Sequence, residues 1–248
     1  MVPTSSSVVQ FEYRDSTGTA VGVSAAEVIG ADILRGSPVR RPSSYVGQRH
    51  YPGIFWSATT RTQLLYESLL EESFLWVADF DSAITGIASQ PFRLRGQFLG
   101  RMRSHVPDFL LQTVEGRFRV VDVKPEDKLD RPEVAEIFEW TSRVCASKGW
   151  EYQVFTGVRR IILRNIRLIG RYRTAGLFFD PPLVGVGAED LAGLTVSEAS
   201  GALEPFASVE RSALSLVLER LWWGEVGVDL RVPLSGSSLL FEGESRGF

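Results

Sequence analysis

The stretch HVPDFLLQTVEGRFRVVDVK, residues 105–124, decides the fold. Its two halves, Val106–Thr113 and Arg117–Val123, are rich in apolar and β-branched residues, and the segment VEG at 114–116 separates them. Two such runs joined by a short connection that contains glycine predict a β-hairpin. The residue before Asp108 is a proline, which has no N–H to donate to a strand ladder and therefore suits a strand start. We expect Asp108 at the beginning of the first strand.

The end of the second strand carries charged side chains. Because side chains alternate between the two faces of a strand, Asp122 and Lys124 share one face while Val121 and Val123 point into the core. The hairpin is expected to bring Asp108 near Asp122, and two clustered carboxylates ionise most readily with a divalent cation between them. Mg²⁺ (or Mn²⁺) suits such oxygen ligands, and Lys124 is then placed to orient or activate an attacking water.

A helix is predicted ahead of the hairpin, over Gln63–Ala78. Its apolar residues recur at helical spacing: Leu64, Leu65, Leu69, Leu70, Phe74 and Val77. Glu67 and Glu71 are four residues apart and so share one face of this helix. We expect Glu71 to supply the remaining acid of the site, and Glu67, one turn earlier, stays open as the alternative.

The segments around the hairpin complete a layered core. Strands are predicted over Ile84–Ala88 and Phe92–Leu99, where the apolar period is two. A helix begins at Pro132 and ends before Gly149, as first-turn prolines and C′ glycines indicate, and a strand over Glu151–Phe155 follows. Helix, antiparallel strands, helix and strand in this order predict an α/β (α+β) core.

The composition restricts the chemistry of a metal site. The 248 residues include one cysteine, Cys145, and two histidines, His50 and His105. A disulfide framework and a zinc site built from cysteine or histidine are therefore not expected, which leaves a hard cation held by carboxylates. We expect His105 to fix the approach to Asp108 by hydrogen bonding. No apolar run reaches the length of a membrane span and the N-terminus lacks a signal peptide pattern, so a cytoplasmic location is expected.

Charge is distributed unevenly along the chain, whose net charge is −3. Residues 186–248 carry ten acidic and four basic side chains, and the rest of the chain carries 20 acidic and 23 basic ones. Six arginines and no acidic residue lie in Arg159–Arg173, where apolar residues separate them. Because phosphate contacts need a local basic patch, this segment is predicted to bind DNA. The predicted DNA-binding residues are Arg159, Arg160, Arg164 and Arg167.

The last 60 residues predict a second, smaller domain. The sequence TVSE at 195–198 fits a capping box, so a short helix is expected to begin there. A second helix is predicted from Ser208 as N-cap to Trp222, Gly224 ends it, and Val226–Val232 is predicted as a strand. Helices followed by a hairpin are the order of a winged-helix module. Because the charges along the second helix balance, we expect protein binding rather than specific DNA reading.

Several motifs together resemble a known family, the TnsA-like endonuclease subunit of heteromeric transposases. The resemblance covers roughly residues 50 to 175. The segments that carry it are YESLLEESF (66–74), DFD (79–81), QP (90–91), HVPDF (105–109) and VDVKP (121–125).

The resemblance implies a restriction-endonuclease-like nuclease of the PD-(D/E)xK type in the bacterial cytoplasm. Such a subunit hydrolyses phosphodiester bonds at the 5′ ends of the transposon with Mg²⁺. A separate DDE-type transposase subunit cuts and joins the 3′ ends, and the C-terminal domain contacts an AAA+ ATPase regulator. Matched position by position, the implied catalytic residues are Glu71, Asp108, Asp122 and Lys124. The implied metal-binding residues are Glu71, Asp108, Asp122 and Val123.

The predicted domain organisation follows from these segments. Residues 1–50 form an N-terminal extension that packs on the core, residues 51–180 the nuclease domain, and residues 186–248 a winged-helix-like domain of α+β class that binds proteins. Two other functions stay open. One is a stand-alone restriction or repair nuclease, and the other is a non-catalytic adaptor that has kept the nuclease fold.

Overall fold

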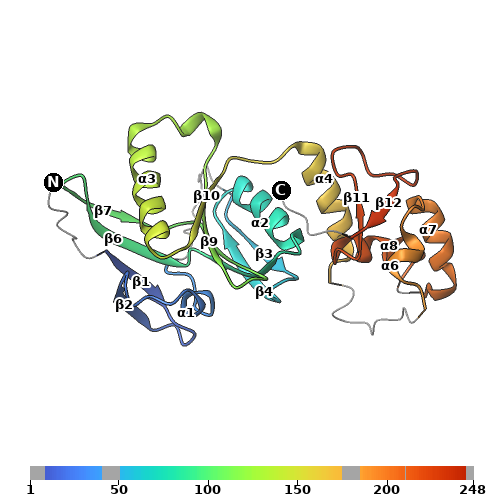
Figure 1. Ribbon diagram of the computed structural model, residues 1–248, viewed down its shortest axis with the longest axis horizontal. Helices are drawn as coiled ribbons and strands as arrows, with labels where there is room; N and C mark the ends of the chain where they lie inside the picture. The colour runs from blue at the N-terminus through green and yellow to red at the C-terminus, as the bar shows by residue number, and fades with distance from the viewer. Residues whose placement is uncertain (1–8, 41–50, 175–184, 210, 244–248) are drawn as a thin grey trace. The chain divides into compact units, whose positions relative to one another are not determined.

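The computed structural model describes residues 9–40, 51–174, 185–209 and 211–243 (Figure 1). The chain divides into two units, Met1–Leu75 with Ile84–Gly157 and Trp76–Ala83 with Val158–Phe248, and each is described by itself. The nuclease domain predicted from the sequence extends to residue 180, whereas this division groups the described residues from 158 onward with the C-terminal part. The functional domain boundaries stay a prediction.

The predicted hairpin lies at the centre of a four-stranded sheet in the first unit. In spatial order the strands are β10 (Glu151–Phe155), β9 (Phe118–Val123), β8 (Phe109–Thr113) and β5 (Ile84–Ser89). β8 and β9 pair antiparallel, and Gly116 has φ +77° in their connection, which confirms the hairpin. β10 pairs parallel with β9 and therefore needs a crossover connection. The 3₁₀ turn η1 (Glu126–Lys128) and the helix α3 (Pro132–Ser147) form it.

A second four-stranded sheet belongs to the same unit. Its order is β2 (Ala20–Ser24), β1 (Gln10–Arg14), β6 (Phe92–Phe98) and β7 (Arg101–His105), and all neighbours are antiparallel. A short helix, α1 (Gly30–Leu34), follows β2. One buried cluster joins Phe92 and Leu94 of this sheet, Leu110 and Val120 of the hairpin sheet, and Trp140 of α3. Burial of these large apolar side chains holds the hairpin, the second sheet and α3 together around one core.

The predicted helix over Gln63–Ala78 is wrong at its start. Residues 62–66 form the strand β4 (Thr62–Tyr66), which pairs antiparallel with β3 (Gly53–Ser57), and the helix α2 spans Leu69–Phe80. The Ser68 hydroxyl accepts a hydrogen bond from the Glu71 N–H at 3.2 Å, as a helix-capping hydroxyl does. An apolar pair such as Leu64-Leu65 fits a strand and a helix equally, and pairing with β3 decides between them.

The described part of the second unit has a mixed α+β composition. Its helices are α4 (Arg160–Ile169), η2 (Gly170–Tyr172), α6 (Ala188–Leu191), α7 (Val196–Leu203), η3 (Glu204–Phe206) and α8 (Ala213–Trp222). Its strands, β11 (Val226–Val228) and β12 (Leu240–Glu242), pair antiparallel. Trp222 of α8 is buried, and its ring contacts the rings of Trp76 and Phe80, with centroids 6.3 and 5.3 Å apart. The last turns of α2 therefore belong to this core.

Capping side chains set where α7 and α8 of the second unit begin. The predicted capping box is confirmed, because Thr195 Oγ1 accepts from the Glu198 N–H at 3.2 Å and Glu198 accepts from the Thr195 N–H at 2.8 Å. The predicted helix start at Ser208 is wrong. Ser208 caps only a turn, and Ser212 caps α8, its hydroxyl accepting from the Ser215 N–H at 3.2 Å. The strand predicted over Val226–Val232 ends at Val228.

No helix in the described part of the chain is both long and apolar enough to cross a bilayer.

Asn165 of α4 organises a loop of the second unit. Its amide nitrogen donates to the carbonyls of Leu230 at 2.9 Å and Val232 at 2.7 Å, and its amide oxygen accepts from the Leu234 N–H at 3.2 Å. The side chain is 2% exposed, so water cannot replace these bonds easily.

We therefore expect Asn165→Ala to lower the free energy of unfolding by about 2–4 kcal/mol, since it leaves three backbone groups without their partner. Urea denaturation followed by circular dichroism measures this. Arg164→Ala, an exposed change on the same helix, is the control and should stay within about 0.5 kcal/mol of the parent. A loss for Asn165→Ala no larger than that of the control contradicts the expectation.

Candidate active site

The predicted site residues line one cavity of about 430 Å³ in the first unit. Glu71 reaches it from the first turn of α2, and Asp108 from the position just before β8. Asp122 and Val123 reach it from the end of β9, and Lys124 from the position just after it. The other described residues of its wall are Arg40, Glu67, Arg93, Ser104, His105, Val106 and Phe138. The hairpin and α2 thus bring together all five residues that the sequence analysis assigned to catalysis or metal binding.

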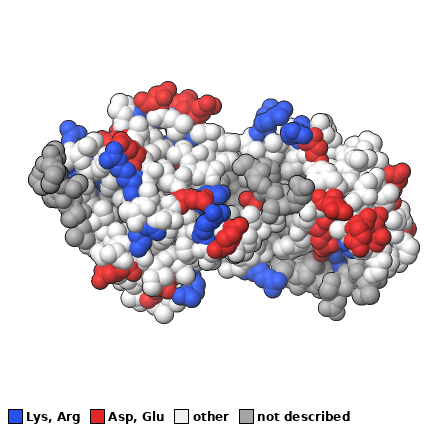
Figure 2. Space-filling view, viewed as in Figure 1, with Lys and Arg blue, Asp and Glu red and all other residues white. Residues whose placement is uncertain are grey.

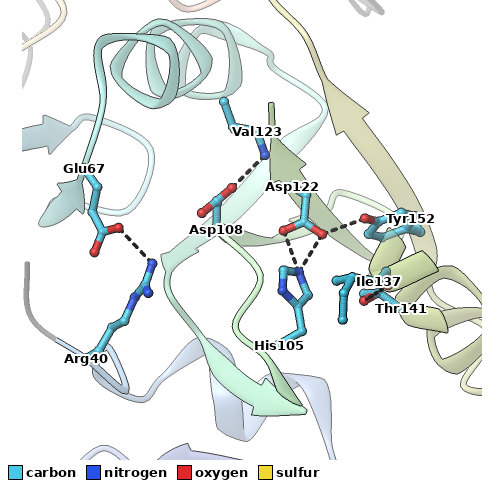
Figure 3. A network of polar contacts seen from close by, with 9 residues as sticks. All are labelled: Arg40, Glu67, His105, Asp108, Asp122, Val123, Ile137, Thr141 and Tyr152. Carbon is cyan, nitrogen blue, oxygen red and sulfur yellow. Dashed lines mark hydrogen bonds and ion pairs between the residues drawn. The ribbon is translucent and has the colours of Figure 1, made fainter. Parts of the chain in front are cut away.

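Asp108 holds its carboxylate in a fixed place. Its Oδ2 accepts a hydrogen bond from the Val123 N–H at 2.7 Å (Figure 3). Its backbone carbonyl accepts from the Gln90 N–H at 2.7 Å. Burial raises the pKa of Asp108 well above its ordinary value, and the charges of Asp122 and Glu71 raise it further. The Val123 N–H and the Arg40 guanidinium act in the opposite direction. The ionised form of Asp108 would therefore be stabilised by an additional positive charge nearby.

Glu71 and Glu67 both line the cavity, but they differ in their partners. Glu71 is 8% exposed; its Oε2 accepts from the Glu67 N–H at 2.7 Å and its Oε1 from the Ser68 hydroxyl at 3.0 Å. Glu67 accepts from the Arg40 guanidinium at 2.8 Å. The charge of Glu71, and not that of Glu67, is among the main causes that raise the pKa of Asp108. This electrostatic coupling favours Glu71 as the acid that works with Asp108.

Asp122 lies deeper than its neighbours, with 2% of its surface exposed. Both carboxylate oxygens lie 2.9 Å from Nε2 of His105, and Oδ2 also accepts from the Tyr152 hydroxyl at 2.6 Å (Figure 3). The expectation that His105 fixes the approach to Asp108 is therefore wrong in its partner: the imidazole bonds Asp122. His105 is the last residue of β7, and from there its ring reaches the carboxylate of Asp122 on β9, in the other sheet.

Lys124 follows the last residue of β9. Its backbone N–H donates to the Phe155 carbonyl at 3.0 Å, which continues the parallel pairing with β10 by one residue. Among the described residues its ammonium makes no hydrogen bond or ion pair, although four carboxylates share the cavity with it. The ammonium is therefore available to an anion that enters the cavity.

The donors of the cavity fit a hard divalent cation in their chemistry. Carboxylates and a backbone carbonyl are the oxygen ligands that Mg²⁺ and Mn²⁺ take, and the raised pKa of Asp108 shows that positive charge would stabilise its ionised form. Within the described residues, no three His, Cys, Asp or Glu side chains are already grouped closely enough to hold an ion. The carboxylates therefore line a cavity but do not form a preassembled set of metal ligands.

The predicted DNA-binding arginines lie on α4, in the second unit. Arg160, Arg164 and Arg167 are exposed, and with Arg171 they line a hollow of about 770 Å³. Their spacing of four, three and four residues places them along one face of a helix. Figure 2 shows Lys and Arg side chains gathered over α4 and acidic ones over α6 and α7. Arg159 is also exposed but precedes the helix.

Sequence reasoning missed the arginines of the cavity. Arg40 lies in a loop, 27 residues before its partner Glu67, and no local pattern predicts such a pairing. Arg93 lies on β6, the strand next to β7, and its side chain reaches the cavity wall from the second sheet. The sequence predicts the strand and its alternating pattern, but it does not show which face of the strand lies toward the hairpin, and so it does not place Arg93 in the cavity.

The fold and the cavity together define a mixed α/β protein whose site combines clustered carboxylates with a lysine. Residues 81–157, about a third of the chain, match the model of a family described as TnsA-like endonuclease N terminal. The resemblance drawn from the motifs is thereby confirmed for this segment, which is similar to the N-terminal domain of TnsA-like endonucleases, and the match supports a nuclease related to transposition. It contains Asp108, Asp122 and Lys124, while Glu71 precedes it. No curated protein matches the chain.

The surroundings of Asp108 predict a stability effect. Its pKa is raised in the folded chain, so the ionised carboxylate destabilises the fold at a pH above that raised value, and the penalty disappears as the pH falls below the ordinary pKa. Asp108→Asn removes the charge and keeps an oxygen that accepts from Val123. We expect the variant to melt about 2 °C or more above the parent at pH 8 without divalent ions, since about 1 kcal/mol shifts Tm by about 2–4 °C at this size.

Calorimetric melting curves from pH 8 to pH 4 check this expectation. The difference in Tm should shrink as the pH falls, because Asp108 of the parent becomes protonated. Asp130→Asn, in the loop that leads to α3, is the matched control and should show no such pH-dependent difference. A variant that melts below the parent at pH 8 contradicts the expectation.

Proposed function

We propose that this protein is the DNA endonuclease subunit of a heteromeric transposase, which hydrolyses phosphodiester bonds at the 5′ ends of the transposon with Mg²⁺ (or Mn²⁺). The observation that carries the proposal is the cavity in which Asp108, Asp122 and Lys124 meet, inside the segment that matches the TnsA-like family. Two acids and a lysine on adjacent strands, with a third acid from a helix, are the arrangement that PD-(D/E)xK nucleases use.

The residues that would hold the cation are Glu71, Asp108 and Asp122, with the carbonyl of Val123. When bound, the cation supplies Lewis-acid stabilisation to the phosphate and lowers the pKa of a water molecule. Asp108 Oδ2 is already bonded to the Val123 N–H, so its Oδ1 is the oxygen left for a ligand. One oxygen of Asp108 is thus fixed by a hydrogen bond while the other is free to bind a cation in the cavity, as expected of a metal ligand.

Lys124 and the cavity arginines supply the positive charge for the substrate. The ammonium of Lys124 binds a phosphate oxygen and stabilises the negative charge that develops when water attacks phosphorus. Arg93, which also lines the cavity, is proposed to bind the same phosphate. Arg40 is partly neutralised by Glu67 and therefore contributes less. These three cations offset the repulsion between the acids and the DNA backbone.

The second unit would contact DNA and partner subunits through different surfaces. The exposed arginines of α4 suit the phosphates of the transposon end, with Arg159, Arg160, Arg164 and Arg167 as the proposed contacts. Trp223 and Leu214 of the α8 region are 40% and 48% exposed in an acidic part of the chain, which suits a protein surface. We assign this part to a winged-helix-like module that contacts the DDE-type transposase subunit or the AAA+ ATPase regulator.

The nuclease proposal predicts that Lys124→Ala reduces cleavage of a transposon-end duplex at least about 100-fold, because one preorganised donor to the transition state is lost. Asp108→Ala should abolish cleavage. Strand nicking in the presence of the partner transposase and Mg²⁺ measures both. Lys148→Ala, at the end of α3 and outside the cavity wall, is the matched control and should cleave normally.

Two results would replace the proposal by its alternatives. Cleavage at a fixed sequence by the isolated chain favours a stand-alone restriction or repair nuclease. Absence of divalent-ion binding, together with unchanged nicking by folded Asp108→Ala and Lys124→Ala, favours an adaptor that has kept the nuclease fold.

The arginine face of α4 predicts how binding depends on salt. Arg160→Ala and Arg164→Ala should each weaken DNA binding and each reduce the slope of log Kd against log salt by about 1, since each removes one phosphate contact. Fluorescence anisotropy with a transposon-end duplex between 50 and 300 mM salt measures the slope. Arg35→Ala, whose guanidinium is paired with Asp32 at 2.6 Å, is the control. Equal slopes in all variants would remove α4 from the DNA interface.

A further inference from the structure

The Asp122 carboxylate takes part in a buried network that the motif does not contain. His105, the last residue of β7 in the other sheet, and Tyr152 on β10, which neighbours β9, both approach it. The two donors lie 2.9 and 2.6 Å from its oxygens (Figure 3). The ring of Phe138 on α3 packs against both donors, with ring centroids 6.3 Å from His105 and 6.2 Å from Tyr152. Three strands and one helix thus converge on one carboxylate.

The chemistry of the donors fixes their protonation. An ionised carboxylate only accepts hydrogen bonds, so His105 must carry its hydrogen on Nε2 to bond Asp122. Burial raises the pKa of Tyr152 above its ordinary value, and the Asp122 charge raises it further, so the phenol keeps the proton that it donates. Neither side chain can turn away without leaving a carboxylate that is 2% exposed without its partners.

The two oxygens of Asp122 are used unequally. Oδ2 receives the tyrosine hydroxyl and a share of the imidazole N–H, while Oδ1 receives only the other share of that N–H. A carboxylate offers about four lone-pair positions, so Oδ1 retains the larger free capacity. The same face of β9 presents Lys124 two residues later.

We propose that His105 and Tyr152 are positioning residues for the Asp122 carboxylate: His105 bonds both oxygens, Tyr152 holds Oδ2, and Oδ1 is left as the freer oxygen for the cation of the proposed nuclease site. The inference rests on the proposed function. Residues that orient a ligating carboxylate affect metal affinity without touching the metal, and their removal typically costs 10- to 100-fold.

Isothermal titration of the full chain with Mn²⁺ tests the proposal without relying on cleavage. Tyr152→Phe and His105→Ala should each weaken Mn²⁺ binding by about 10- to 100-fold and reduce strand nicking at saturating DNA. His105→Gln keeps an N–H donor and should recover part of the affinity lost in His105→Ala. Tyr172→Phe removes a hydroxyl that makes no hydrogen bond among the described residues, and it should bind Mn²⁺ as the parent does.

A double-mutant comparison separates positioning from a general structural role. If His105 and Tyr152 act through Asp122, adding Tyr152→Phe to Asp122→Ala causes no further loss of Mn²⁺ affinity, because the clamped group is already absent. Thermal melting confirms that each variant is folded. Additive losses, or a folded Tyr152→Phe variant with parental affinity, overturn the positioning proposal while the nuclease proposal stands. A parent chain that binds no Mn²⁺ overturns both.

Discussion

The hydrogen bond from the Val123 N–H to the Asp108 carboxylate is the contact on which the cavity depends. The ladder between β8 and β9 ends at the pair Phe109 and Val121, and beyond it the Asp108 side chain takes the place of the next backbone acceptor. The Asp108 carboxylate therefore extends the hydrogen-bonded pairing of the hairpin by one bond. An acidic side chain is held at the end of two inner strands because it takes part in their pairing.

Holding Asp108 in this place is electrostatically unfavourable, because two other carboxylates lie nearby. Asp108, Asp122 and Glu71 lie close enough that the charges of the last two raise the pKa of the first. Each acid has its own donors: Asp108 has a backbone N–H, Glu71 has Ser68 and another backbone N–H, and Asp122 has His105 and Tyr152. Hydrogen bonds stabilise a carboxylate without neutralising it. The arrangement keeps three acids near one another and leaves their summed charge for a cation to offset.

The sequence predicts the hairpin and its chemistry because both are local. Gly116 marks the turn, and alternation along β9 puts Asp122 and Lys124 on one face. What it does not predict is non-local. The pair Leu64-Leu65 becomes a strand through β3, and β7 has no apolar period because only one of its sides is covered. His105 and Asp122 lie in different sheets, and Arg40 and Glu67 are 27 residues apart in the sequence. Neither contact can therefore be predicted from the residue pattern of a single helix or strand.

The choice between Glu71 and Glu67 shows how a structural role and a chemical role meet in one residue. Glu71 occupies the first turn of α2, where its carboxylate satisfies the Glu67 N–H and the Ser68 hydroxyl. That position also suits its charge, since helix N-termini favour anions. Glu67 lies before the helix and is bound by Arg40, which lowers the free charge that it offers to the cavity. A capping glutamate is held in place before any ligand arrives, whereas Glu67 would first have to give up its arginine. Pre-organisation therefore favours Glu71, even though its cap bonds occupy part of its lone-pair capacity.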